Sequence, residues 1–236
     1  MTAVFGKWQD WTWFERIWLA LFTAINFILF FAWNDTILGL ISSISGMLCV
    51  VLVAKGRIGN YFFGIIQTAT YGYIAYTYQL YGESMLNLLF YLPTQFIGIY
   101  MWLKHKKPEN EAVHGETVYA KRLSMKQWLI VIVAFAIGAV LYGWLLTSIN
   151  AQQVRIDSMA VVLSVIAQIL MILRFAEQWI IWILVNVLTI TLWVITLVQT
   201  GGNDWTMVVM WSAFLANSVY GYVNWLRIAK GQVNEQ

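Results

Sequence analysis

One short stretch of the sequence combines flat aromatic side chains with an amide. Residues 174–193 read RFAEQWIIWILVNVLTITLW, and Trp179, Trp182 and Asn186 stand at positions i, i+3 and i+7 among Ile, Leu and Val. In an α-helix this spacing places the three side chains on one face. An indole ring offers a flat surface for stacking, and a carboxamide both donates and accepts hydrogen bonds. This face suits a small molecule with an aromatic ring and hydroxyl groups, and a cationic ring would gain about 0.5–2 kcal/mol from each indole.

The Asn186 amide also has a simpler interpretation, in which it only joins neighbouring helices. An unsatisfied amide in an apolar environment costs about 1–3 kcal/mol, and a hydrogen bond between membrane helices contributes about 0.6 kcal/mol. The first half of the chain holds a similar set, Asn60, Phe63 and Gln67, at the same spacing. The repetition favours polar faces that line a cavity.

The composition predicts that these faces lie in a membrane protein. Of the 236 residues, 61% are hydrophobic and 11% are charged, against about 25% charged in a typical soluble domain. The mean hydropathy is +0.69. Because a bilayer core needs about 20 mostly apolar residues per helix, we expect eight membrane-spanning helices. Their approximate ranges are 16–33, 36–54, 59–79, 84–103, 126–147, 158–173, 178–199 and 205–226.

The distribution of basic residues predicts the orientation of these helices. Of the 14 Lys and Arg residues, all except Arg155 flank the side on which the N-terminus lies. By the positive-inside rule both termini are therefore expected in the cytoplasm. Residues 105–125 are polar and read as a cytoplasmic linker, and no nucleic-acid partner is expected.

An internal repeat organises the expected helices. GIYMWLK at 98–104 and GYVNWLR at 221–227 share the pattern Gly-x-x-x-Trp-Leu-Lys/Arg. The predicted fold is therefore an all-α membrane protein with one extra N-terminal helix and a 3+1+3 parallel-repeat core. Parallel repeats occur in transporters, whose substrate sites lie near the bilayer midplane. The expected boundaries are 1–34 for the interfacial segment and extra helix, 35–104 for the first repeat, 105–125 for the linker, 126–156 for the linking helix, 157–227 for the second repeat and 228–236 for the tail.

The residues inside the expected helices limit the chemistry. No Asp, Glu, Lys or Arg falls in the middle of a span, whereas ion-coupled pumps place ionisable groups there. This absence predicts passive, facilitated movement. Paired carboxylates, His clusters and nucleophile–base pairs are also missing, so we expect no enzyme, metal or cofactor. Pro93 predicts a kink in the fourth span, either static or, with Gly98, a hinge for alternating access.

The Trp-x-x-Trp-x-x-x-Asn motif at 179–186, with the repeat and the additional first span, resembles the PnuC family of bacterial vitamin transporters. This family is related in fold to the SWEET sugar transporters. The resemblance covers about residues 15–230. It implies facilitated uptake of nicotinamide riboside, a vitamin B3 precursor for NAD biosynthesis, across the bacterial inner membrane. It also implies trapping by a cytoplasmic riboside kinase and a homotrimer with one pathway in each protomer.

The same resemblance assigns roles to individual residues. Trp182 and Asn186 would bind the substrate near the midplane, and Trp179 would support or gate it. The counterparts Asn60, Phe63 and Gln67 in the first repeat follow from the internal match.

Two other functions stay open at this stage. A tryptophan pair suits several flat rings, so the substrate could be thiamine, riboflavin or a sugar. A non-transporting membrane receptor or assembly subunit, in which the repeats only pack, would also have an apolar chain. The lack of a large soluble signalling domain weighs against a receptor.

Overall fold

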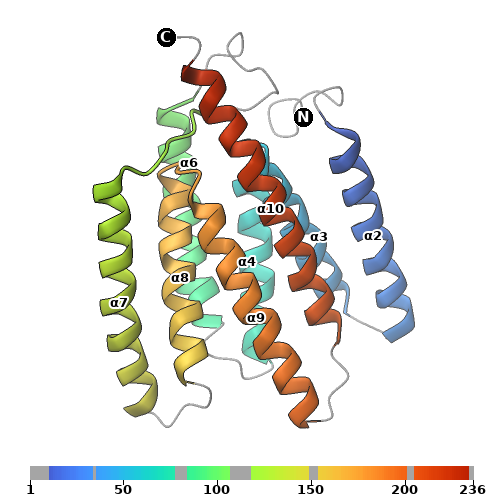
Figure 1. The fold of residues 1–236 in the computed structure, drawn as a ribbon. Helices are drawn as coiled ribbons and strands as arrows, with labels where there is room; N and C mark the ends of the chain where they lie inside the picture. The colour runs from blue at the N-terminus through green and yellow to red at the C-terminus, as the bar shows by residue number, and fades with distance from the viewer. Residues whose placement is uncertain are drawn as a thin grey trace. The chain divides into compact units, whose positions relative to one another are not determined.

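The computed structural model describes residues 11–33, 36–77, 84–106, 118–148, 154–200 and 205–233. These residues are almost entirely helical, which confirms the all-α prediction for them (Figure 1). The expected N-terminal segment, cytoplasmic linker and tail lie partly outside the described residues, which do not include 1–10, 107–117 and 234–236. The helices are α2 (Trp13–Trp33), α3 (Ile37–Ala54), α4 (Asn60–Thr77), the π-helix η2 (Leu86–Tyr91), α6 (Leu92–Lys104), α7 (Met125–Ser148), α8 (Val154–Ile172), α9 (Gln178–Thr200) and α10 (Trp205–Val233).

Several of these helices are suited to a bilayer. Among the described residues, five stretches are long and apolar enough to cross a membrane, namely α2, α3, η2 with α6, α7 and α8. In addition, α9 contains a shorter apolar stretch, Gln178–Thr191. No described residue of α7 is buried, and Trp144 is 73% exposed. Apolar surface of this length and exposure is typical of a helix that faces lipid, so the chain is a multi-pass membrane protein.

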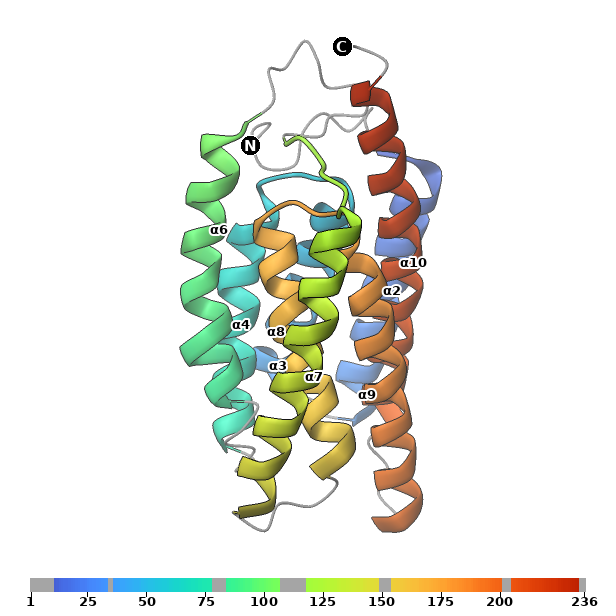
Figure 2. The ribbon, with the colours of Figure 1, turned by 60° about the vertical axis from the view of Figure 1, so that its left-hand side comes forward.

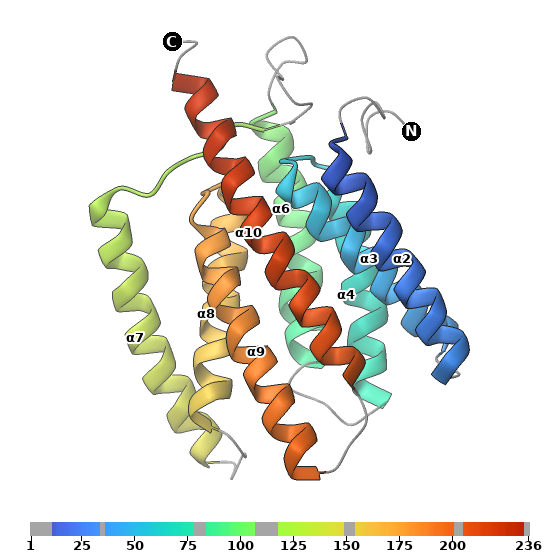
Figure 3. The same cartoon turned by 45° about the vertical axis from the view of Figure 1, so that its right-hand side comes forward.

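The chain divides into two compact units. The first comprises Met1–Tyr119 with Lys230–Gln236, and the second comprises Ala120–Ala229. In the first unit α3 packs against α2 and α4, and α4 also packs against η2 and α6; α2 and α3 lie side by side (Figures 1 and 3). In the second unit α8 packs against both α7 and α9 (Figure 2). Helix-on-helix packing of this kind positions the polar residues of each unit.

The first described helix of each unit begins with a capping box. At α2, the Thr12 N–H donates to Glu15 Oε2 at 2.7 Å and the Glu15 N–H donates to Thr12 Oγ1 at 3.3 Å. At α7, the Ser124 N–H donates to Gln127 Oε1 at 2.9 Å, and Ser124 Oγ accepts from the Gln127 N–H at 3.4 Å. These reciprocal bonds satisfy backbone donors that a helix start leaves without partners.

The turn after α3 and the turn after α8 share one hydrogen-bonding pattern. Gly56 and Arg174 both have left-handed backbone conformations, with φ values of 64° and 65°. The Gly56 N–H donates to Val53 O at 2.9 Å, and the Arg174 N–H donates to Met171 O at 3.0 Å. Each following N–H donates five residues back, at 2.9 Å in both turns. Both helices therefore end in a Schellman motif.

A π-helical stretch comes directly before Pro93, where the sequence predicts a kink. The six-residue helix η2 ends shortly before Pro93, and the Leu92 N–H donates to Asn87 O, five residues back. A proline ring clashes with the carbonyl four residues back in an α-helix, and the wider π turn redirects the carbonyls that the ring would meet. In contrast, α10 is α-helical from Trp205 to Val233. The hinge role of Pro93 stays a prediction.

A buried ion pair connects α2 to the turn between α3 and α4. Lys55 Nζ donates to Glu15 Oε2 at 2.6 Å, and the two side chains are 4% and 1% exposed. Lys55 Nζ also lies 5.0 Å from the ring centroid of Trp11. Removing one member of a buried ion pair costs about 3–5 kcal/mol, because the other charge stays buried.

We therefore expect Lys55→Met to lower the melting temperature of the detergent-solubilised protein strongly. The double variant Glu15→Gln/Lys55→Met should recover most of the loss, because no buried charge remains. Thermal unfolding followed by tryptophan fluorescence measures both effects. Lys126→Met, at an exposed position in the first turn of α7, is the control and should unfold like the wild type. A double variant no more stable than Lys55→Met would contradict this account.

Candidate functional site

The amide of Asn186 connects α9 to α10. Asn186 is 2% exposed, and its Nδ2 donates to Ser218 Oγ at 2.9 Å. The Ser218 hydroxyl donates in turn to Phe214 O at 2.8 Å. A carboxamide has a second N–H and a carbonyl oxygen, so this contact leaves hydrogen-bonding capacity for a ligand.

Trp182 lies one turn before Asn186 and is half-buried. Part of its ring packs against the apolar core formed by α8, α9 and the turn between them. The buried members of that core are Leu163, Ala167, Leu170, Phe175, Ile181 and Val185. The core therefore fixes the indole on one side and leaves part of its surface open.

Trp179 has a different environment from Trp182. Its side chain is 2% exposed and lies against Gly221 of α10, where an added Cβ would stand 2.6 Å from the indole Cε2. The glycine thus lets α10 approach the ring closely. Of the two roles expected for Trp179, this packing fits support of the Trp182–Asn186 face.

The first unit contains the same device. Tyr61 is fully buried and lies against Gly98 of α6, so that an added Cβ at Gly98 would overlap the phenol ring. The Tyr61 ring also meets Trp102 edge-on, with centroids 5.1 Å apart. Gly98 is therefore a close-packing position, and its expected hinge role stays a prediction.

The three residues predicted in the first unit do not share one environment. Asn60 is fully buried, and its Nδ2 donates to Arg57 O at 2.7 Å. Phe63 is 8% exposed and meets Phe62 edge-on at 5.1 Å. Gln67 is half-buried on α4. Their assignment to the substrate site stays a prediction.

The backbone corrects the register of the internal match. The Asn60 N–H donates to Arg57 O at 3.1 Å, and the Gln178 N–H donates to Phe175 O at 3.3 Å, at the equivalent position of the second turn. Asn60 therefore corresponds to Gln178, whereas the sequence match had paired it with Trp179. Pairing the two turns thus differs by one residue from pairing the side-chain types.

With the corrected register, Thr68 occupies the place of Asn186 and Gly64 that of Trp182. Gly64 lies under Gln95 of α6, whose Oε1 would stand 2.5 Å from an added Cβ. Gln95 is 4% exposed, and this oxygen has no hydrogen-bond partner among the described residues. The aromatic–amide spacing did not indicate Gln95 or Ser218, although each is a polar residue inside an apolar segment.

Charged groups hold the start of α9. Glu177 is 2% exposed, and it accepts from Arg122 Nε at 2.6 Å and from the Leu123 N–H at 2.9 Å. The hydrogen bond to Glu177 raises the pKa of Arg122. Partial burial, followed by the nearby charge of Arg174, lowers the pKa of Lys121. The segment before α7 is thereby fastened to the turn that starts α9.

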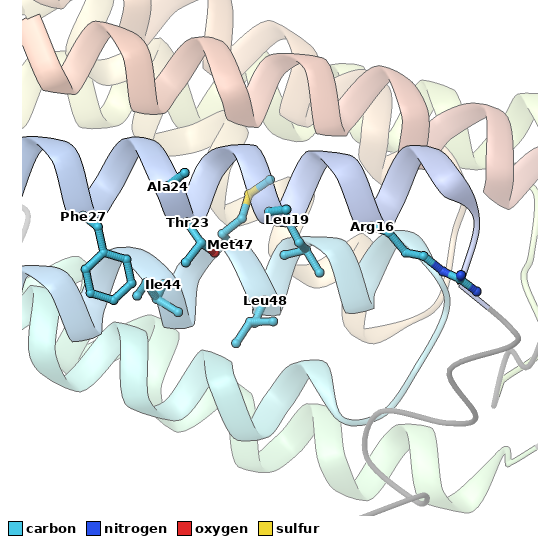
Figure 4. A pocket seen from close by; sticks show the side chains of 9 residues that line it. Arg16, Leu19, Thr23, Ala24, Phe27, Ile44, Met47 and Leu48 are labelled. Carbon is cyan, nitrogen blue, oxygen red and sulfur yellow. The ribbon is translucent and has the colours of Figure 1, made fainter.

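A metal site and a surface groove are the other candidate sites, and neither involves the predicted site residues. No group of three His, Cys, Asp or Glu side chains in the described part of the chain could hold a metal ion. A groove of about 480 Å³ lies between α2 and α3 in the first unit (Figure 4). None of the predicted site residues lines it. Its lining residues are Arg16, Leu19, Ala20, Thr23, Ala24, Phe27, Ile44, Met47 and Leu48.

Comparison with known proteins identifies the family. A family model described as nicotinamide mononucleotide transporter matches residues 36–227. The chain belongs to this family. A relative from Neisseria mucosa, named nicotinamide riboside transporter PnuC, is 44% identical over 93% of this chain and 83% of its own length. A relative of the same name from Haemophilus influenzae is 42% identical over 94% of this chain and 93% of its own length.

A solved structure is similar over nearly the whole chain. It is titled crystal structure of the vitamin B3 transporter PnuC, and it matches with a TM-score of 0.85 and 43% sequence identity. The match covers 97% of this chain and 95% of the other. The fold is therefore that of a known transporter.

The contact between Gly221 and Trp179 yields a prediction about stability. We expect Gly221→Ala to lower the melting temperature by several degrees, because overpacking a tight contact costs about 1–3 kcal/mol. Gly143→Ala in α7 is the matched control, since a Cβ added at Gly143 would lie 3.5 Å from the nearest side-chain atom, Ser158 Oγ. Alanine favours a helix over glycine, so the control should be as stable as the wild type or more stable. Equal melting temperatures for the two variants would contradict the close contact.

Proposed function

We propose that this protein carries nicotinamide riboside by facilitated diffusion across the bacterial inner membrane. The observation that carries the proposal is the half-buried Trp182 beside an amide, Asn186, that keeps hydrogen-bonding capacity. The names of the relatives described above support the same substrate. Phosphorylation by a cytoplasmic riboside kinase would then trap the vitamin precursor inside the cell.

The chemistry of nicotinamide riboside matches this face. Its pyridinium ring is flat and cationic, so that stacking on the Trp182 indole adds cation–π attraction to apolar contact. Its carboxamide and ribose hydroxyls both donate and accept hydrogen bonds, as does the Asn186 amide. Trp182 would thus bind the ring, and Asn186, one turn later, would bind the carboxamide or a ribose hydroxyl.

The family name raises the mononucleotide as a second substrate. A nucleotide phosphate is recognised by Arg or Lys, and no Lys or Arg occurs between Arg174 and Arg227. The segment that carries Trp182 and Asn186 therefore has no basic side chain that could pair with the phosphate of the mononucleotide. This favours the riboside. Thiamine and riboflavin stay as the other flat candidates.

The positions of the charged residues support passive movement. Among the described residues, the buried ion pair Lys55–Glu15 and the half-exposed pair Arg122–Glu177 lie at helix ends or in turns. Coupling to a proton or sodium gradient uses ionisable groups within the membrane, and the spans have none at their centres. Facilitated diffusion needs no such group.

The proposal also includes the finer architecture. It comprises eight membrane-spanning helices in a 3+1+3 parallel repeat, cytoplasmic termini and a homotrimer. The matching Schellman motifs after α3 and α8 support the repeat. The excess of Lys and Arg on one side supports the orientation, and the trimer rests on the family resemblance.

Calorimetric titration of nicotinamide riboside into the purified, detergent-solubilised protein tests the site. Trp182→Ala and Asn186→Ala should each weaken binding by about 2 kcal/mol, which is roughly 30-fold in Kd. Val187→Ala, on the exposed side of α9, is the control and should bind like the wild type. Melting temperatures establish that each variant is folded.

Competition with the mononucleotide, thiamine and riboflavin tests the substrate. The riboside should displace itself at far lower concentration than any of the three. A well-folded wild type that binds thiamine or riboflavin more tightly would change the proposed substrate. A wild type that binds none of them would point to the receptor or assembly role.

A further inference from the structure

Gln178, the first residue of α9, has a side chain that the fold does not account for. It is fully buried, yet neither Nε2 nor Oε1 has a hydrogen-bond partner among the described residues. A buried polar group without a partner destabilises the folded state. Native proteins keep few such groups, and each calls for an explanation.

The equivalent residue in the first unit shows that a local hydrogen bond is available at this position. Asn60 donates from Nδ2 to Arg57 O at 2.7 Å, across the turn before α4. The backbone of Gln178 makes the matching contact to Phe175 O at 3.3 Å, but its side chain does not. Capping of the turn therefore does not explain the Gln178 amide.

The helical position of Gln178 links it to the candidate site. Gln178, Trp182 and Asn186 stand at i, i+4 and i+8, so that they follow one another along one face of α9. With a rise of 1.5 Å per residue, Gln178 lies about 6 Å along the axis on one side of Trp182 and Asn186 about 6 Å on the other. Trp179, in contrast, is packed against Gly221. A ring on Trp182 would have an amide beyond each of its ends.

We propose that Gln178 is a third substrate-contacting residue, which hydrogen-bonds one polar end of the ligand on the N-terminal side of Trp182. Its Oε1 accepts from a hydroxyl or amide N–H, and its Nε2 donates to a hydroxyl or carbonyl oxygen. The ligand class is a flat ring with a neutral polar group at each end. This inference rests on the proposed function, because the riboside is the ligand that would supply hydrogen-bond partners to the Gln178 amide.

The test separates a ligand contact from a purely structural role. Gln178→Met keeps the length of the side chain and removes both polar atoms. If the Gln178 amide has hydrogen-bond partners only when a ligand is bound, the ligand-free variant should melt at the wild-type temperature or above, since no unsatisfied group remains. Its Kd for nicotinamide riboside, measured by calorimetry, should rise about tenfold. Trp182→Ala should also have a higher Kd than the wild type, because both residues would contact the same ligand.

The control makes the same replacement elsewhere in the second unit. Gln127 Oε1 accepts from the Ser124 N–H at the start of α7, so Gln127→Met should lose some stability and keep the wild-type Kd. Gln178→Ala, which leaves room for water, is the second variant and decides the matter if Gln178→Met is less stable than the wild type.

The outcomes distinguish this inference from the proposed function. A folded Gln178→Met or Gln178→Ala protein that binds the riboside with the wild-type Kd overturns the inference, while the weak binding of Trp182→Ala would leave the proposed function intact. A wild type that does not bind the riboside overturns both. Weaker binding by Gln178→Met at an unchanged or higher melting temperature supports the contact.

Discussion

The bilayer offers no hydrogen-bond partners to polar groups, and this constraint governs the whole molecule. Hydroxyls within the helices comply by bonding to their own backbone, as Thr68 does to Gly64 O at 2.8 Å and Thr189 to Val185 O at 2.9 Å. Asn186 complies by bonding to Ser218 of the next helix. Because these side chains have partners within the fold, polar side chains that keep spare hydrogen-bonding capacity are candidates for ligand contact.

Packing then decides which aromatic side chains are free to meet a ligand. Gly98 and Gly221 bring α6 and α10 onto Tyr61 and Trp179, so these rings are buried between helices. Trp182, one turn later on α9, keeps part of its surface open. Trp179 thus packs α9 against α10, and in the proposed site this contact would hold the neighbouring Trp182–Asn186 face in place.

The sequence predicted most helix bounds to within a few residues, because long apolar runs and basic flanks are dictated by the membrane itself, but α10 continues to Val233, past its expected end at 226. The sequence also predicted an aromatic–amide face on α9, whose role in substrate binding stays a prediction. It could not predict that Arg174 takes a left-handed conformation, since glycine is the usual residue there and only Gly56 carries that signal. Because the turn at Arg174 has no glycine, pairing by side-chain types and pairing by the turns differ by one residue. Burial of Gln178 depends on packing between helices that are distant in sequence, and periodicity does not encode it.

In the proposed function, nicotinamide riboside crosses by facilitated diffusion through the Trp182–Asn186 face. The most direct test is uptake of radiolabelled riboside into proteoliposomes that contain the purified protein, no kinase and the same ions on both sides. The account predicts that label enters until its concentration is equal inside and outside, that preloading with unlabelled riboside accelerates entry, and that Trp182→Ala abolishes both. Uptake that requires a proton or sodium gradient, even down a substrate gradient, would contradict it.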